Sequence, residues 1–137
     1  MSRPPVEIQV QEGITEIRLQ HEKLTRYYTQ VESLIASGVE NFSALDLALD
    51  GLIHYTTKCF DREESLMRLT GYPRTADHTR SHDMFMRRLN GYRSKLLEGK
   101  YSANEVMSLL KIWMNGHIEQ QDLHLIESLQ GFAESPA

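Results

Sequence analysis

The chain has 137 residues, of which 40% are hydrophobic and 25% are charged, so it can bury one substantial core but is too short for two domains. A net charge of −4 and the lack of a basic run argue against a nucleic-acid partner. No segment is suited to a signal peptide or a membrane span, and a single cysteine cannot form an internal disulfide. We therefore expect one cytoplasmic domain over residues 1–137 with no membrane partner.

The N-terminal part is predicted to be an extended arm followed by a long helix. Residues 1–12 contain Pro4 and Pro5 and are expected to be extended. The helix should run from about Ile14 to Ser37, and Gly38 should end it. Its inward-facing stripe is spaced by four and three residues and consists of Ile17, His21, Leu24, Tyr28, Val31 and Ile35.

A second helix is predicted to begin near Ser43, where Ser-Ala-Leu-Asp resembles a capping box. Gly71 should stop it, and Tyr72-Pro73 should form the turn that follows. Its stripe contains Leu45, Leu49, Leu52, Thr56, Cys59, Glu63 and Leu66. Two polar residues of this stripe, Cys59 and Glu63, are one helical turn apart.

Two further helices complete the pattern. The third is expected from about Thr75 to Leu97, and the fourth opens with a second capping box, Ser102 to Glu105. Their stripes are His78, His82, Phe85, Leu89, Tyr92 and Leu96, and then Val106, Leu110, Trp113, His117, Ile118, Asp122, Leu125 and Leu129. Strand-like alternation is absent from the sequence. The predicted fold is all-α: an up-down-up-down four-helix bundle over about residues 13–131.

Polar residues with metal-binding side chains lie on or beside all four stripes. The set is His21, Cys59, Glu63, His78, His82, His117 and Asp122. Unpaired imidazoles and carboxylates are costly to bury, so their place on apolar faces calls for a shared partner. His78 and His82 are four residues apart and can grip one ion from one helix face, although such a pair alone is weak evidence.

The fourth helix offers two alternative pairs of ligands. His117 and Asp122 are five residues apart, and a π-bulge between them would bring both to the inner stripe. His124 is the rival to Asp122, because seven residues from His117 return to nearly the same face. We favour Asp122, since a bridged site needs carboxylates. His54 is expected to point away from the stripe.

The chemistry of the set favours two metal ions. Iron and manganese accept oxygen donors beside imidazole, and a carboxylate can bridge two cations. Two carboxylates among several histidines therefore indicate a two-metal centre rather than a tetrahedral zinc site. The competing interpretation is a polar core satisfied by its own hydrogen bonds, which is a costly arrangement for six ionisable groups.

The chain resembles the bacterial hemerythrins, from residue 12 to about 130. The resemblance is carried by EGITEIRLQHEKL, CFDREESLM, GYP, HTRSHDMF and WMNGHIEQQD. It implies a non-haem di-iron centre, with two iron ions, that binds O2 reversibly. By this resemblance one iron would be held by His78, His82 and His117. The other would be held by His21 and residue 59, with Glu63 and Asp122 bridging both.

The sequence departs from the family pattern at residue 59. The family motif has histidine where this chain has Cys59, directly before Phe60 and four residues before Glu63. A thiolate is a strong anionic donor that should favour ferric iron, so it puts reversible O2 binding in doubt. The alternative is an inert buried thiol beside an iron that is one ligand short. The family's N-terminal tryptophan is also missing.

Packing in the core is the first interpretation of the other stripe residues. The resemblance implies that some of the aromatic and aliphatic side chains around the centre also enclose the ligand pocket: Phe60, Phe85, Met86, Trp113 and Ile118. Tyr27, Tyr28 and Tyr55 are interpreted as packing residues, and Glu64 as solvent-exposed.

Three functions remain open at this point. The first is binding of O2 or a related small ligand for storage, delivery or sensing. The second is an enzyme with a thiolate-modified centre that reduces O2, peroxide or nitric oxide, or a redox or metal sensor. The third is a protein that holds zinc or a single metal ion. No dedicated substrate pocket or proton-transfer residue is evident, which favours binding over catalysis.

Overall fold

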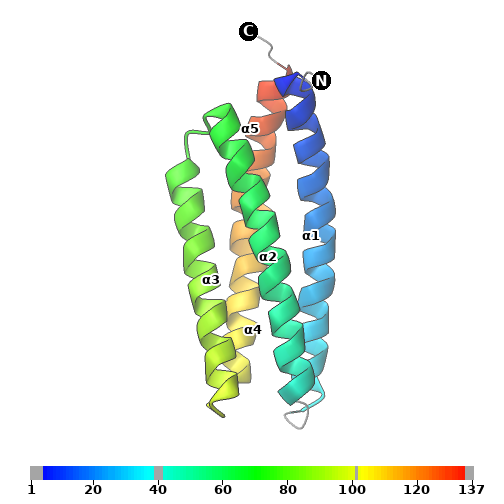
Figure 1. Cartoon of the computed structure of the whole chain (residues 1–137), viewed down its shortest axis with the longest axis vertical. Coiled ribbons are helices and arrows are strands. Elements are labelled where there is room, and N and C mark those ends of the chain that lie inside the picture. The colour runs from blue at the N-terminus through cyan, green and yellow to red at the C-terminus, as the bar shows by residue number, and fades with distance from the viewer. Residues whose placement is uncertain (1–4, 39–41, 101, 135–137) are drawn as a thin grey trace.

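The computed structural model describes residues 5–38, 42–100 and 102–134. These residues form helices and no strand: α1 (Val6–Ala36), α2 (Phe42–Thr70), α3 (Thr75–Leu97), α4 (Ala103–Ile112), the π-helix η1 (Trp113–Asp122) and α5 (Leu123–Glu134). The last three follow one another without a break and make one long rod. Figure 1 shows the four rods alternating in direction, with the α2–α3 connection at the same end as the start of α1. The predicted all-α bundle is confirmed.

The predicted extended arm is wrong for residues 6–12, which belong to α1. Pro5 directly precedes the helix with φ −51° and ψ 150°, a place where the missing N–H of proline costs nothing. Val10 is fully buried and extends the stripe of Ile14 and Ile17 back by one turn. The prolines therefore mark the start of a helix. Residues 1–4 of the predicted arm lie outside the described residues.

The predicted helix ends agree with the structure, apart from the start of α1 and one cap. Gly38 and Gly71 have φ values of 100° and 65°, the left-handed region that favours glycine, just after α1 and α2. At α4 the Ser102 hydroxyl accepts a hydrogen bond from the Glu105 N–H at 3.4 Å, as the second capping box predicts. Ser43 lies inside α2, which already begins at Phe42, so the first predicted cap is wrong.

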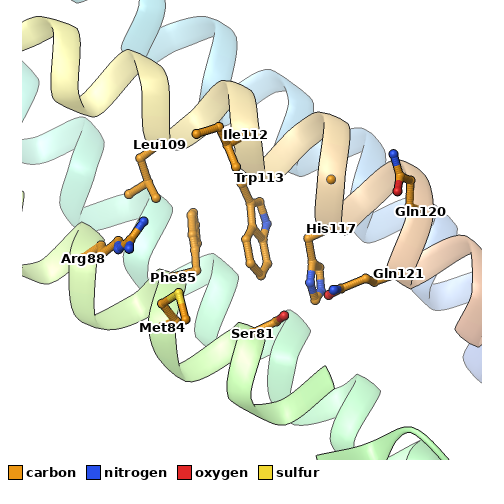
Figure 2. Close-up of a pocket in the computed structure, with 11 residues that line it drawn as sticks. Ser81, Met84, Phe85, Arg88, Leu109, Ile112, Trp113, His117, Gln120 and Gln121 are labelled. Atoms are coloured by element: carbon orange, nitrogen blue, oxygen red, sulfur yellow. The ribbon is translucent and has the colours of Figure 1, made fainter. Parts of the chain in front are cut away.

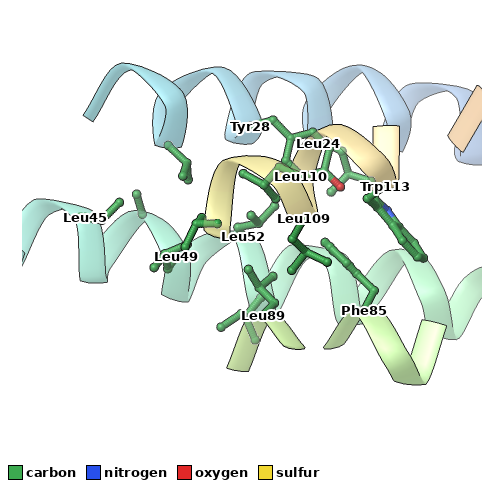
Figure 3. Packing of buried hydrophobic residues seen from close by; sticks show 14 of the residues in the cluster. Leu24, Tyr28, Leu45, Leu49, Leu52, Phe85, Leu89, Leu109, Leu110 and Trp113 are labelled. Atoms are coloured by element: carbon green, nitrogen blue, oxygen red, sulfur yellow. The ribbon is translucent and has the colours of Figure 1, made fainter. Parts of the chain in front are cut away.

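The core consists of two apolar clusters along the bundle. The larger contains Leu24, Tyr28, Leu49, Leu52, Cys59, Phe60, Phe85, Leu89, Leu110 and Trp113, among others, and much of it is drawn in Figure 3. The smaller contains Val10, Ile14, Ile17, Leu66, Met67, Tyr72, Leu125, Ile126, Leu129 and Ala133. Along α1, α2 and the fourth rod, the polar stripe residues fall between these two clusters. None of the described helices has the length and apolar composition needed to cross a membrane.

Candidate metal centre

Three histidines form one side of the polar layer between the clusters. His78 and His82 project from α3 and His117 from η1, and each is at most 4% exposed. Their ring centroids are 4.6 Å apart for His78 and His82, 4.5 Å for His78 and His117, and 4.9 Å for His82 and His117. The three imidazoles therefore converge on one point, as the sequence predicted.

Glu63 of α2 extends between these histidines and His21 of α1. Its Oε1 atom lies 3.0 Å from His78 Nε2 and 3.2 Å from His82 Nε2. Its Oε2 atom lies 3.8 Å from His21 Nε2. One carboxylate thus offers its two oxygens to two different groups of nitrogen donors.

Asp122, the last residue of η1, does the same from the opposite helix. Its Oδ1 atom lies 2.9 Å from both His78 Nε2 and His117 Nε2, and its Oδ2 atom lies 3.0 Å from His21 Nε2. Possible ligand atoms of five residues lie within 4.8 Å of one another: Glu63, His78, His82, His117 and Asp122. His21 faces the far oxygens of both carboxylates. This is the arrangement that two bridging carboxylates require.

The π-helix explains how His117 and Asp122 come to share a face. Residues five apart in an α-helix point about 140° away from each other. The i→i+5 hydrogen bonding of η1 removes most of this offset, and Trp113, His117 and Asp122 are all buried. The sequence analysis suggested a π-bulge between His117 and Asp122, and the structure has a π-helix of ten residues there.

The charges in the layer stabilise one another. Burial lowers the pKa of His21 and of His78, but close polar contacts and charge interactions with Asp122 and Glu63 outweigh burial and raise each to about 9. Burial and mutual repulsion raise the pKa of Glu63, yet its close contacts with the ring nitrogens of His21, His78 and His82 bring it below the ordinary value. Protons on the histidines therefore balance the carboxylates, and a cation would have to displace those protons.

Several donor atoms in the layer fit a cation better than they fit one another. The buried Nε2 atoms of His21, His82 and His117 and the Oδ1 atom of Asp122 have no hydrogen-bond partner. His117 Nε2 and Asp122 Oδ1 are only 2.9 Å apart, so their contact is close without the alignment of a hydrogen bond. Convergent, misaligned donors of imidazole and carboxylate type are what iron coordination needs. In a polar core satisfied by its own hydrogen bonds, each of these nitrogen and oxygen atoms would have a hydrogen-bond partner.

Aromatic rings pack against two of the histidines. Phe60 stacks on His82 at 3.7 Å between ring centroids, Trp113 stacks on His117 at 3.8 Å, and Phe85 stacks on Trp113 at 4.2 Å. Of the other predicted pocket residues, Met86 and Ile118 are partly buried against the same apolar cluster. These contacts fix the planes of the imidazoles.

A surface pocket of about 290 Å³ opens beside His117, between α3 and the fourth rod. Figure 2 shows the Trp113 and His117 rings descending side by side toward α3, with Phe85 next to Trp113. Phe85 and Trp113 are the two predicted pocket residues that line it. The pocket therefore approaches the side of the centre that carries three histidines.

Glu64 is not the plain surface residue that the sequence analysis expected. Its side chain is 22% exposed, and its Oε2 atom lies 2.9 Å from His82 Nδ1. A carboxylate that accepts from one ring nitrogen fixes the tautomer and leaves the other nitrogen free to bind a metal. The sequence carries no signal for this pair, because it joins two helices whose relative rotation is set by the fold.

Truncation of Glu64 should weaken metal binding. We expect Glu64→Ala to lower metal affinity about 10- to 100-fold, because His82 loses the partner that orients its ring. Competition with a chelator of known affinity measures the change. Asp61→Ala is the matched control, since Asp61 is exposed on the same helix. Equal affinities for the two variants would contradict an orienting role for Glu64.

The two remaining histidines lie outside the centre. His124 is exposed, and its Nδ1 lies 3.2 Å from the Tyr72 hydroxyl, so it is not the alternative to Asp122. The side chain of His54 is 77% exposed, and its Nδ1 lies 2.9 Å from the Asp50 carbonyl oxygen. Both observations agree with the ranking made from the sequence.

Cys59 is fully buried one turn before Glu63. Burial and then the negative charges of Glu63 and Asp122 raise the pKa of its thiol to about 12, although a hydrogen bond with Tyr55 lowers it slightly. The thiol is therefore close enough to both carboxylates to sense their charge. It is not among the five residues whose ligand atoms converge within the described part of the chain.

Fold and site together define a four-helix-bundle protein with a buried cluster of histidines and carboxylates that could bind metal. The family model described as the hemerythrin HHE cation-binding domain matches residues 12–129, and the chain belongs to this family. The hemerythrin domain implies a di-iron centre, and the layer described above is the cluster that could hold it.

Named relatives support the same assignment. A bacteriohemerythrin of Stenotrophomonas maltophilia is 30% identical over 110 residues, which cover 80% of this chain and 71% of that protein. Bacteriohemerythrins of Pseudomonas aeruginosa and Pseudomonas paraeruginosa are each 27% identical over 118 residues, or 86% of this chain and 76% of theirs. No solved structure matches the chain.

Proposed function

We propose that this protein binds O2, or a related small ligand, at a di-iron centre, for storage, delivery or sensing. The observation that carries the proposal is the division of oxygens: Glu63 and Asp122 each present one oxygen to the three-histidine side and one to His21. This arrangement serves two ions better than one. Membership of the hemerythrin family supports O2 as the ligand.

In this proposal the residues divide between two ions. His78, His82 and His117 would hold one iron. His21 and Cys59 would hold the other, and Glu63 and Asp122 would each offer one oxygen to either ion. Ferrous iron would supply the electrons for O2 binding. The second iron would have fewer protein donors, which would leave that side of the layer available to the ligand.

The protein's own part is to exclude water and keep the donors oriented. Phe60, Phe85 and Trp113 are at most 7% exposed, and together with Met86 and Ile118 they are proposed to enclose the ligand pocket. Apolar walls slow oxidation of ferrous iron by keeping water and protons away. Iron bound beside them is therefore expected to stay reduced longer than in a hydrated site.

Cys59 is proposed to ligate the second iron and to alter its chemistry. It shares the inward face of α2 with Glu63, and the negative charges of Glu63 and Asp122 act on its thiol. A bound dication reverses that electrostatic effect and removes the thiol proton. The competing view, an inert buried thiol, is favoured by the high pKa in the absence of a cation.

Iron content and response to O2 test the main proposal. Anaerobically reconstituted protein should carry close to two iron ions per chain, because both sides of the layer supply donors. Admission of O2 should change its visible absorption. Elemental analysis measures the first result and stopped-flow spectroscopy the second. A product with a single zinc ion per chain would contradict the di-iron proposal.

An enzymatic role is the second candidate, and Cys59 is the observation that favours it. A thiolate donor stabilises ferric iron, which suits reduction of O2, peroxide or nitric oxide more than reversible carriage. Steady consumption of one of these compounds in the presence of an electron donor would support the enzyme. The cytoplasmic location and the absence of a nucleic-acid partner stay predictions.

A further inference from the structure

Two buried hydroxyl groups lie in the core without a hydrogen-bond partner. Tyr28 of α1 is 2% exposed and Thr56 of α2 is 0% exposed, and neither hydroxyl oxygen is paired. A buried hydroxyl without a partner is destabilising, so both groups need an explanation. Simple packing, the role that the sequence analysis gave Tyr28, would be served as well by phenylalanine.

Thr56 differs from other helical threonines in its hydrogen bonding. Five other helical threonines donate to the carbonyl oxygen four residues earlier: Thr15, Thr25, Thr29, Thr57 and Thr70. Thr57, the next residue, donates to the Ile53 carbonyl oxygen at 2.9 Å. Thr56 has the same helical environment but keeps its hydroxyl out of that bond. Its hydroxyl is thus free to bind something else.

The pairing of α1 with α2 brings Tyr28 and Thr56 into the stretch of the bundle that contains the second metal position. Glu16 pairs with Arg62, and Tyr27 stacks on Tyr55 at 5.2 Å between ring centroids. These two contacts fix an antiparallel alignment in which the stretch 21–28 lies opposite 52–59. In this alignment His21 lies opposite Cys59, with Thr56 about one turn from Cys59 and Tyr28 about two turns from His21 along the helices.

The Tyr28 hydroxyl is directed toward that position. Helical side chains lean toward the N-terminus of their helix, so the phenol of Tyr28 extends back along α1 in the direction of His21. Figure 3 shows the hydroxyl oxygen at the end of the cluster nearer Trp113. Burial and the negative charges of Asp122, Cys59 and Glu63 raise the pKa of Tyr28 well above its usual value, so the phenol keeps its proton.

We propose that the Tyr28 and Thr56 hydroxyls donate hydrogen bonds to a small anion held at the second metal position, beside His21 and Cys59. The inference rests on the proposed di-iron centre and specifies the ligand class of its open side. An apolar wall cannot stabilise a negative charge, whereas two neutral donors can do so without adding charge to the layer. The two hydroxyls therefore strengthen the binding of a ligand that carries negative charge at this position.

Azide binding to the iron-loaded, oxidised protein tests this proposal. Titration followed by visible absorption should show that Tyr28→Phe and Thr56→Val each weaken azide binding about 10- to 100-fold, the effect of one lost hydrogen bond to a charged ligand. The matched controls are Tyr27→Phe and Thr57→Val, which change the same groups one residue away. These controls should bind azide as the wild type does.

A second measurement separates ligand binding from folding. Without metal, Tyr28→Phe should melt no lower than the wild type, because the deleted hydroxyl has no partner there. A lower melting temperature with unchanged azide affinity would overturn the inference, as would a tyrosinate-to-iron absorption band lost in Tyr28→Phe. Wild-type protein that holds two irons but ignores azide would also overturn it. Failure to hold iron would instead remove the proposed function, on which the inference depends.

Discussion

Removal of the metal ions should lower the melting temperature of the protein by roughly 10–20 °C. A ligand present at about 1,000 times its Kd stabilises the folded state by about 4 kcal/mol, which has this effect in a chain of this size. Metal-free protein must keep Glu63 and Asp122 facing each other in the core, where only protonated histidines offset their repulsion. Calorimetry before and after treatment with a chelator measures the difference.

The metal-free protein should also lose stability as the pH rises. The pKa values of His21 and His78 are raised from 6.5 to about 9 in the folded chain, so their contribution is complete below pH 6.5 and disappears as the pH passes about 9. The metal-loaded protein should not show this decline, since its histidines are already neutral. His54→Gln is the control, because His54 is exposed and outside the layer. A chelated protein as stable as the loaded one would mean that these residues are not buried ligands.

Replacement of Cys59 by histidine should convert the centre to stable, reversible O2 binding. Imidazole is a neutral donor, so it favours the diferrous form that reversible binding needs. For the two-electron change between diferric and diferrous iron, a rise in reduction potential of roughly 60 mV would favour the diferrous form about a hundredfold. The wild type, by contrast, should become diferric in air and stay so after O2 is removed. Repeated cycles of aeration and degassing, followed by visible absorption, compare the two proteins.

Cys59→Ser supplies the control for ligation itself. The oxidised wild type should show a thiolate-to-iron charge-transfer band, and serine, which is similar in size, should abolish it. If the wild type cycles O2 as well as Cys59→His does, and Cys59→Ser leaves the spectrum unchanged, Cys59 is a bystander. The protein would then bind O2 at a centre on which the Cys59 sulfur has no effect.

Most of the fold could be predicted because each helix carries one stripe of mainly apolar residues at helical spacing. His21, Glu63, His78, His82, His117 and Asp122 could be selected for the same reason: each interrupts an apolar face at helical spacing, and the structure brings these six side chains together. The start of α1 is not predicted correctly, because a pair of prolines is compatible with an extended chain as well as with a helix start. The buried Val10 was the available signal that the stripe begins earlier.

Other features depend on information that a single stripe does not contain. The contact between Glu64 and His82 depends on how far α2 and α3 are rotated toward each other. The free hydroxyls of Tyr28 and Thr56 are recognisable only when every possible partner has been located. Sequence spacing identifies which face a residue occupies, but lateral pairing and unsatisfied groups emerge only in three dimensions.

The π-helix makes the length of the fourth rod as important as its residues. Val106 and Leu110 pack in one apolar cluster, while Leu125 and Leu129 pack in the other, and η1 lies between the two pairs. An uninterrupted α-helix would turn the second pair away from the first by its accumulated rotation of 100° per residue. Deletion of one residue between His117 and Asp122 would leave them four residues apart, a spacing that a regular α-helix already places on one face. The length of this segment and its i→i+5 winding therefore have to change together if Leu125 and Leu129 are to stay in the second cluster.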